Sequence, residues 1–481
     1  MAPSSAKTVD SIVSNGNGVM HKLNGNANGK QNGFSKSICL PDEKTWEKVT
    51  FKKLLFFNTV ASFMICYYLN FPFYILPVTF LITFVPVFAS FLGVCNFLYH
   101  LFQEKKESSK IDHYVEFVDE TAKAKHSGKY IPIRDLYELY ADGKINFKLD
   151  LLQCLERRHE YVVYKLQWWH LKFFLCKFVP EMLHFKVQDH DQVTDHYDRG
   201  NDFYEAFLGP LMVYTSGIRC REDETLEEMQ INKIKEVCKR ILMKPGDKHL
   251  DIGCGWGTFV NFAAEHYGSK GTGVSISENQ IKWAQEKAVK HNTSASTEFL
   301  CMDYRDIPHS KYDKITCLEM SEHVGIRLYP RFLKQVYNLL DDNGIFYLQI
   351  AGLRRAWKWE DILWGFFMDT YIFPGAEASL PLIFPVGQLE SAGFEVHSVE
   401  TIGVHYSETI KEWYRNWIQP ETRKNMSLKY GSRLCRIWEI FLAWSTIIAR
   451  QGNSTCYMIV AHKNRNEYDR LKFSADRKEI I

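Results

Sequence analysis

The residues that invite a chemical interpretation first are those of "HLDIGCGWGT", residues 249–258. An apolar run ends at Asp251, and three glycines follow in the spacing G-x-G-x-G before a segment typical of a helix. A dinucleotide fingerprint would read G-x-G-x-x-G with an acidic residue about 20 positions later, and a phosphate loop would carry Lys and Ser/Thr. This turn lacks both signatures, and the next strand-like run, "GTGVSIS", ends without Asp or Glu. A ligand with a ribose and an amino-acid tail, such as S-adenosylmethionine, fits better, although a glycine-rich turn of another α/β protein stays open.

The segments around this turn alternate between strand and helix. Strand-like runs cover "KGTGVSI", "TEFLCMDY", "YDKITCLEM" and "GIFYLQIAG", and helix-like runs include "ENQIKWAQEKAVKH" and "YPRFLKQVYNLL". Such alternation predicts an α/β fold with a doubly wound, mostly parallel sheet whose ligand lies at the carboxyl ends of the strands. That edge would gather Gly253–Gly257, Ser275–Gln280, Asp303–Tyr304, Glu319–His323 and Gln349–Gly352.

Composition narrows the class of partner. The chain has 481 residues and a formal net charge of +2, so nothing favours nucleic acid as a partner. Twelve cysteines occur without a zinc-ligand spacing, which indicates reduced thiols and no metal site. The aromatic share of 15% suits contact with lipid or an apolar substrate.

Residues 54–99 contain no Asp, Glu, Lys, Arg or His. One membrane-spanning helix needs about 20 apolar residues, so this run predicts a transmembrane hairpin with helices at about 54–70 and 77–101. Lysines flank both ends, which predicts a multi-pass membrane protein with both termini in the cytosol. A re-entrant or buried hairpin is the alternative. A membrane chain of this kind that acts on lipid is expected in the endoplasmic reticulum, with the glycine-rich turn facing the cytosol and Asn292, in an Asn-x-Ser triplet, unmodified.

The domain prediction follows these features. We expect a disordered polar tail over 1–45, the transmembrane hairpin over 54–102, and a helical connector with a membrane-interface segment over 103–190. The catalytic domain would cover 191–465, and 466–481 would form a C-terminal tail.

Several longer motifs carry a family resemblance. "DHYDRGNDFYEAFLGPLMVYTSGI", "LDIGCGWGT", "CLEMSEHVGIRLY" and "FPGAEASLP" resemble the superfamily of cyclopropane-fatty-acid synthases and mycolic-acid methyltransferases. "FYLQIAGLRRAW", "TIGVHYSETIKEWYRNW" and "RIWEIFLAWSTIIARQG" are closer still to the fungal-type sphingolipid C9-methyltransferases, over about residues 50–465. The resemblance implies methyl transfer from S-adenosylmethionine to carbon 9 of the unsaturated long-chain base of ceramide or glucosylceramide.

The resemblance also implies the cofactor contacts. Tyr214 and Thr215 would touch the cofactor, and the turn from Asp251 to Thr258 would hold its methionine end. Gln280 is the expected hydrogen-bond partner near the ribose, and Asp303 and Tyr304 would border the adenine. The full predicted set is Tyr214, Thr215, Asp251, Gly253, Gly255, Gly257, Thr258, Ser275, Ile276, Ser277, Glu278, Asn279, Gln280, Asp303 and Tyr304.

The active centre departs from the cyclopropane synthases, whose bicarbonate site uses Cys, Glu, His, Ile and Tyr. Here Ser216, Gln349 and Ala351 stand at three of those positions, and only Glu322 and Tyr406 match. The resemblance therefore disfavours bicarbonate and ring formation.

Methyl transfer to an alkene leaves a carbocation, and we expect Glu322 to stabilise it or remove a proton, with Tyr406 assisting and Ser216 and Gln349 completing the site. Glu319 stays open as the functional acid of its segment. Two other functions also stay open: a cyclopropane synthase acting on unsaturated phospholipid acyl chains, and a non-catalytic membrane scaffold.

Overall fold

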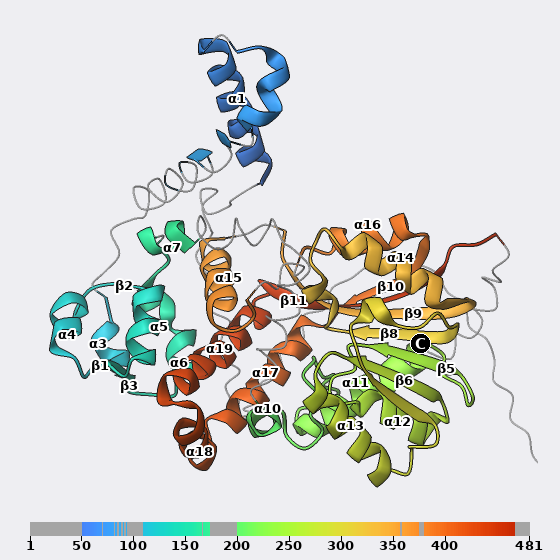
Figure 1. Cartoon of the computed structure of the whole chain (residues 1–481). Helices are drawn as coiled ribbons and strands as arrows, with labels where there is room; N and C mark the ends of the chain where they lie inside the picture. Colours follow the sequence, from blue (N-terminus) through green and yellow to red (C-terminus); the bar gives the residue numbers. More distant parts are fainter. Residues whose placement is uncertain are drawn as a thin grey trace, which may run out of the picture. The chain divides into compact units, whose positions relative to one another are not determined.

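The centre of the structure is a seven-stranded sheet with the strand order β10-β11-β9-β8-β5-β6-β7 (Figure 1). Its strands are β5 (Lys248–Ile252), β6 (Lys270–Ser275), β7 (Thr297–Cys301), β8 (Tyr312–Leu318), β9 (Leu340–Leu353), β10 (Phe394–Thr401) and β11 (Ser454–Lys463). Neighbouring strands from β7 to β9 pair in parallel, whereas β11 pairs antiparallel with both β9 and β10. The predicted mostly parallel sheet is confirmed. The order reverses at β5, which places a ligand crevice at the carboxyl ends of β5 and β8.

The computed structural model describes residues 51–69, 71–80, 82–83, 86–87, 90, 93, 109–165, 167–173, 200–355, 358–374 and 380–466. The predicted tail over 1–45 lies outside the described residues, as do nearly all of 466–481, much of the predicted second span and residues 174–199 of the connector.

Helices cover both faces of the sheet because side chains alternate along each strand. In β9, Ile345 and Tyr347 pack on one face with α11 (Leu226–Arg240) and α12 (Thr258–Tyr267). Phe346 and Leu348 pack on the opposite face with α14 (Tyr329–Leu339) and α16 (Ile383–Ala392). α13 (Glu278–Lys290) packs beside α12 through Ala284 and its apolar neighbours. This alternation explains the doubly wound architecture.

A second core joins the connector to helices from the end of the chain. The connector contains α3 (Ile111–Tyr114), α4 (Glu120–His126), α5 (Ile133–Ala141), α6 (Leu151–Glu156) and α7 (Trp168–Phe173). It also contains four short strands: β1 (Val115–Phe117) pairs with β3 (Ile145–Phe147), and β2 (Ile131–Pro132) pairs with β4 (Val162–Val163). The helices that complete this core are α10 (Asn201–Leu208), α15 (Trp359–Tyr371), α17 (Gly403–Trp417) and α19 (Ser432–Arg450). α18 (Pro420–Tyr430) connects the last two and buries none of its side chains.

The N-terminal described segment consists of α1 (Phe51–Tyr68), a short turn η2 (Phe73–Ile75) and the residues that follow. Polar side chains lie between its two arms: the Ser62 hydroxyl contacts the Thr83 hydroxyl at 2.7 Å, and the Asn58 amide donates to the Phe80 carbonyl at 3.0 Å. Large apolar side chains lie on the outside. Among the described residues, no helix is both long and apolar enough to cross a bilayer.

A buried ion pair connects the connector to α15. Arg158, which is 1% exposed, donates from Nε to Glu360 Oε1 at 2.7 Å, and the Tyr164 hydroxyl donates to the same oxygen at 2.7 Å. The Arg158 guanidinium, together with the donated hydrogen bonds, lowers the pKa of Glu360 to about 2 against the opposing effect of burial. The Glu360 carboxylate therefore stays charged in a dry environment and depends on its partner.

We predict that Arg158→Met lowers the free energy of unfolding by about 3–5 kcal/mol, because it leaves the Glu360 charge buried without its counter-ion. The matched control is Arg157→Met at the neighbouring position. The Arg157 side chain is 53% exposed, so this substitution should lower the free energy of unfolding by less than about 1 kcal/mol. Denaturant unfolding of the detergent-purified chain, followed by tryptophan fluorescence, measures both. Equal stability of the two variants would contradict this role for the pair.

Candidate active site

The glycine-rich turn after β5 brings the backbone close to the pocket. Gly253 has φ +80°, and a Cβ added there would lie 2.5 Å from Met320 Cβ, so a larger residue would push away the loop that follows β8. Gly255 has φ +52°, and an added Cβ would meet nothing within 4 Å. Because Gly255 lines the cavity, this open space is where a ligand can approach the backbone closely. Gly257 is the N-cap residue that precedes α12, and it does not line the cavity.

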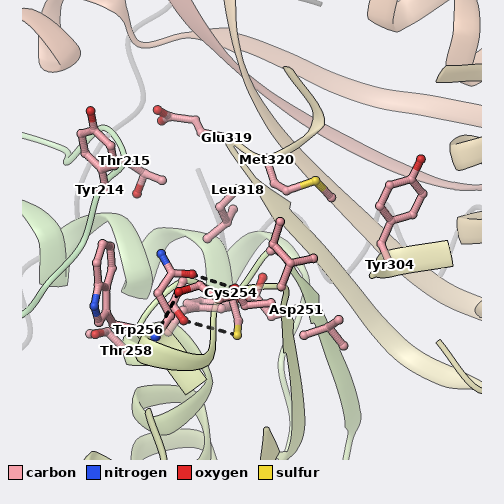
Figure 2. Close-up of a pocket in the computed structure, with 18 of the residues that line it drawn as sticks. Tyr214, Thr215, Asp251, Cys254, Trp256, Thr258, Tyr304, Leu318, Glu319 and Met320 are labelled. Atoms are coloured by element: carbon pink, nitrogen blue, oxygen red, sulfur yellow. Dashed lines mark hydrogen bonds between the residues drawn. The ribbon is translucent and has the colours of Figure 1, made fainter. Parts of the chain in front are cut away.

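The cavity beside this turn collects most of the predicted cofactor residues (Figure 2). Twelve of them line it: Tyr214, Thr215, Asp251, Gly253, Gly255, Thr258, Ser275, Ile276, Ser277, Gln280, Asp303 and Tyr304. Gly257, Glu278 and Asn279 are not among the lining residues. The cavity wall also includes Trp256, Lys233 and Glu319, which the cofactor prediction did not include. Figure 2 shows Tyr304 on the opposite side of the cavity from Tyr214 and Thr215.

Asp251 and Lys233 give the cavity a buried pair of opposite charges. Asp251 is the penultimate residue of β5 and accepts a 2.6 Å hydrogen bond from the Thr316 hydroxyl, and burial raises the pKa of its carboxyl to about 6. Lys233, on α11, is 1% exposed and donates to the Thr215 hydroxyl at 2.9 Å. Burial lowers the pKa of the Lys233 ammonium to about 8, although Glu319 and Asp251 favour its charged form. The cavity therefore offers a carboxylate to a ligand ammonium and a cation to a ligand carboxylate.

The far wall of the cavity comes from β6 and the segment after β7. The Ser275 hydroxyl donates to Gln280 Oε1 at 2.7 Å, and the Ser277 hydroxyl accepts from the Gln280 backbone N–H and caps α13. Asp303 pairs with the Arg305 guanidinium, with the shorter contact at 2.5 Å. The Tyr304 ring packs edge-on against Phe332. These contacts fix a polar patch and an aromatic surface, which suit a ribose and an adenine respectively.

The predicted catalytic residues surround a different carboxylate from the one we expected. Glu319 follows β8, and its Oε1 accepts from the Ser216 backbone N–H at 2.9 Å and from Gln349 Nε2 at 2.6 Å. The Cys456 thiol lies 3.5 Å from the same oxygen, and the Tyr406 hydroxyl also hydrogen-bonds to Glu319. Ser216, Gln349 and Tyr406 thus come together as predicted neighbours, and Glu319 lies at their centre.

Glu322 is buried and is not among the residues that line the cavity. Its Oε1 accepts from the Ala351 backbone N–H at 2.5 Å, and its other oxygen is buried without a hydrogen-bond partner. Burial, assisted by the nearby Glu319 charge, raises the pKa of Glu322 to about 8, so it holds a proton at neutral pH. Its catalytic role stays a prediction.

Tyr214 lines the cavity, and further aromatic rings pack behind it. The Tyr214 ring lies 5.4 Å from Trp413 and 6.2 Å from Phe373, measured between centroids, and Tyr406 also contacts Trp413 edge-on. Phe373 in turn contacts the ring of His323, whose pKa burial lowers to about 4. Such rings exclude water, and their faces can stabilise a developing positive charge.

Lys233 and Trp256 are among the cavity residues that the predicted set did not contain. Lys233 lies on the buried stripe of α11 together with Met229, Ile234 and Val237. A lysine at a position where the helical pattern expects an apolar residue could have identified it from the sequence. Trp256 lies inside the glycine motif, and the predicted set took from that motif the residues on either side of it. Its indole N–H donates to Asn201 Oδ1 at 2.8 Å. In the described part of the chain, no group of three or more His, Cys, Asp or Glu could hold a metal ion.

Comparison with known proteins agrees with this fold. The mycolic acid cyclopropane synthetase family matches residues 184–459. The cyclopropane synthase MmaA2 of Mycobacterium tuberculosis aligns with a TM-score of 0.54 at 25% identity, covering 57% of this chain and 98% of that protein. The mycolic acid cyclopropane synthase CmaA1, solved with SAH and CTAB, gives the same values. The sheet order and the cavity at its switch point define an S-adenosylmethionine-dependent methyltransferase.

More similar relatives narrow the family. The sphingolipid C9-methyltransferase of Komagataella phaffii is 49% identical over 376 residues, which cover 76% of each chain. Sphingolipid C9-methyltransferase A of Emericella nidulans is 47% identical and covers 81% of this chain and 77% of that one. The sphingolipid C9-methyltransferase of Candida albicans is 43% identical, and the match covers 83% of this chain and 81% of that one. The chain belongs to the sphingolipid C9-methyltransferase family.

We predict that S-adenosylhomocysteine binds about tenfold more weakly at pH 5 than at pH 7.5, because the Asp251 carboxyl, with a pKa of about 6, protonates and no longer attracts the ligand ammonium. Lys233, with a pKa of about 8, stays largely charged over this range. Asp251→Asn should bind weakly at both pH values, and exposed Asp223→Asn should behave as wild type. Isothermal titration calorimetry measures these affinities; a steep pH dependence that persists in Asp251→Asn would contradict the assignment.

Proposed function

We propose that the chain moves a methyl group from S-adenosylmethionine to carbon 9 of the unsaturated long-chain base of ceramide or glucosylceramide. The products are a 9-methyl sphingolipid and S-adenosylhomocysteine. The observation that supports this most directly is the cavity itself, which the glycine-rich turn, Tyr214 and the Glu319 carboxylate line, with the rings of Phe373 and Trp413 packed against Tyr214. The names of relatives at 43–49% identity supply the acceptor and its position.

The residues of the cavity have distinct tasks in this reaction. Bound S-adenosylmethionine supplies an electrophilic methyl group on a positively charged sulfur. Asp251 and Lys233 would hold the amino and carboxylate groups of its tail, and Gln280 and Tyr304 would border its ribose and adenine. The rings of Tyr214, Phe373 and Trp413 would keep water from the acceptor while the alkene carbon next to the methylated one is cationic.

The product depends on which proton leaves that cation. Loss of a proton from the new methyl group would close a three-membered ring, whereas loss from the methylated carbon restores the double bond and leaves a branch. Ser216, Gln349 and Ala351 replace residues of the bicarbonate site that the resemblance implies, and this favours the branched product over a cyclopropane.

We expect membranes containing the chain to methylate an unsaturated ceramide and glucosylceramide, and to leave a phospholipid with oleoyl chains unlabelled. The measurement is transfer of ¹³C from labelled S-adenosylmethionine, followed by lipid mass spectrometry, with NMR for a methyl group on a double bond. Membranes with the Asp251→Asn variant provide the matched control. Cyclopropyl protons in a labelled phospholipid would instead support a cyclopropane synthase, and absence of transfer to any lipid would contradict the proposal.

We also propose that the N-terminal hairpin attaches the enzyme to a membrane, with the catalytic domain in the cytosol at the endoplasmic reticulum. The support is the inverted distribution of side chains in this segment. Asn58 and Ser62 are buried between its arms, whereas Phe56, Tyr74 and Ile82 are 63–80% exposed. Helices in lipid pack through small and polar residues and turn apolar side chains outward. Helices in water instead bury their apolar side chains and expose their polar ones.

We predict that the full chain floats with liposomes in a density gradient at high salt, and that the double variant Phe63→Asp, Ile82→Asp weakens this flotation because it places charges on the outer apolar surface. The matched control is Phe63→Leu, Ile82→Leu, which keeps that surface apolar. In microsomes, protease added outside should reach the catalytic domain and Asn292 should carry no sugar. Glycosylated Asn292, or equal flotation of the charged variant, would contradict the attachment.

A further inference from the structure

The Glu319 carboxylate is held by donors from four separate parts of the fold. The Ser216 backbone N–H comes from the segment before α11, Gln349 from β9, Cys456 from β11 and Tyr406 from α17. The Ser216 and Gln349 contacts are 2.9 Å and 2.6 Å long, and both reach Oε1. Glu319 also lines the cavity, so the side chain is fixed on one side and borders the cofactor space on the other.

The backbone at this position carries a second, independent signal. Glu319 has φ +55°, in the left-handed region that residues other than Gly and Asn rarely adopt. Such a conformation is energetically unfavourable and persists where the surroundings require it. Here it lets Leu318 stay in β8 and Met320 pack beside Gly253, while the Glu319 carboxylate reaches the four donors. Figure 2 shows the Glu319 side chain pointing toward the side of the cavity that holds Tyr214 and Thr215.

The other titratable groups of the region are less suited to accept a proton from the substrate. Glu322 is protonated at neutral pH and does not line the cavity. Burial lowers the pKa of His323 to about 4, but its ring packs against Phe373 in the aromatic wall. Burial and the Glu319 charge raise the pKa of Tyr406 well above its usual range, so it can only donate. Asp251 already accepts from Thr316 beside the glycine turn.

We propose that Glu319 is the catalytic base of the methyl transfer and that its built-in carboxylate does the work of a bound bicarbonate ion. This inference rests on the proposed function. The alkene π electrons form the new bond to the methyl group as the carbon–sulfur bond breaks, and the neighbouring carbon becomes cationic. Glu319 then takes the proton from the methylated carbon, the electrons of that C–H bond restore the double bond, and the proton later passes to solvent. A carboxylate with several donors is a weak base, but a proton beside a carbocation is so acidic that a weak base suffices.

The test uses full-length enzyme with two substitutions at the same position. Glu319→Gln keeps the shape and removes the charge, and we expect it to lower sphingolipid methylation about 10²–10⁴-fold while S-adenosylhomocysteine affinity stays within about threefold. Glu319→Gly suits the left-handed backbone, so it should fold well and leave space for a small anion. Sodium formate or bicarbonate should restore part of its activity and should not stimulate wild type. Glu286→Gln, at an exposed position on α13, is the matched control.

A binding measurement separates this inference from the proposed function. Sinefungin carries an ammonium group where the methyl donor has its sulfonium, whereas the sulfur of S-adenosylhomocysteine is neutral. Glu319→Gln should therefore weaken the binding of sinefungin more than the binding of S-adenosylhomocysteine. If wild type methylates no sphingolipid, the proposed function fails, and this affinity ratio still tests whether the Glu319 charge faces the reacting centre. Methylation within a few fold of wild type in Glu319→Gln, an unchanged ratio, or a larger activity loss in Glu322→Gln than in Glu319→Gln would each overturn the inference.

Discussion

The hydrogen bonds that hold the Glu319 carboxylate depend on the whole catalytic domain being assembled. Their donors come from β9, β11, α17 and the segment before α11, and the acceptor lies at the end of β8. A carboxylate at such a place would carry a large desolvation cost unless it were hydrogen-bonded. The antiparallel strand β11 supplies Cys456 next to β9, so the departure of the sheet from all-parallel pairing has a direct consequence for the site.

The charges of the cavity form a second level of organisation. The Lys233 ammonium interacts with two carboxylates, Asp251 and Glu319, and it also donates to Thr215. Because both carboxylates favour the charged form of Lys233, loss of either one lowers the pKa of this ammonium. The aromatic side chains that surround them belong to a core that the connector, α17 and α19 share. Stability of the connector and dryness of the reaction site are therefore related through common packing.

Much of the fold and of the candidate site could be predicted from the sequence, because the signals were local. Alternating strand and helix periods gave the sheet, and the carboxyl ends of consecutive strands brought Asp251, Ser275, Gln280 and Tyr304 to one cavity as expected. The carboxylate that we propose as the base was harder to choose. Glu319 and Glu322 are three residues apart, and Glu319 alone of the two lines the cavity. Its left-handed backbone conformation cannot be predicted from a sequence pattern. The short strands of the connector were also invisible, since two or three residues carry no period.

The central claim, that a fixed carboxylate removes the proton from the methylated carbon, predicts the fate of isotopes. The decisive measurement supplies S-adenosylmethionine with a fully deuterated methyl group together with an acceptor deuterated at carbon 9, and determines the deuterium content and position in the product. If the carboxylate takes the proton from the methylated carbon, the branched product keeps every deuterium of the methyl group and loses the one at carbon 9. A product that retains the deuterium at carbon 9, or that loses one from the transferred methyl group, would contradict it.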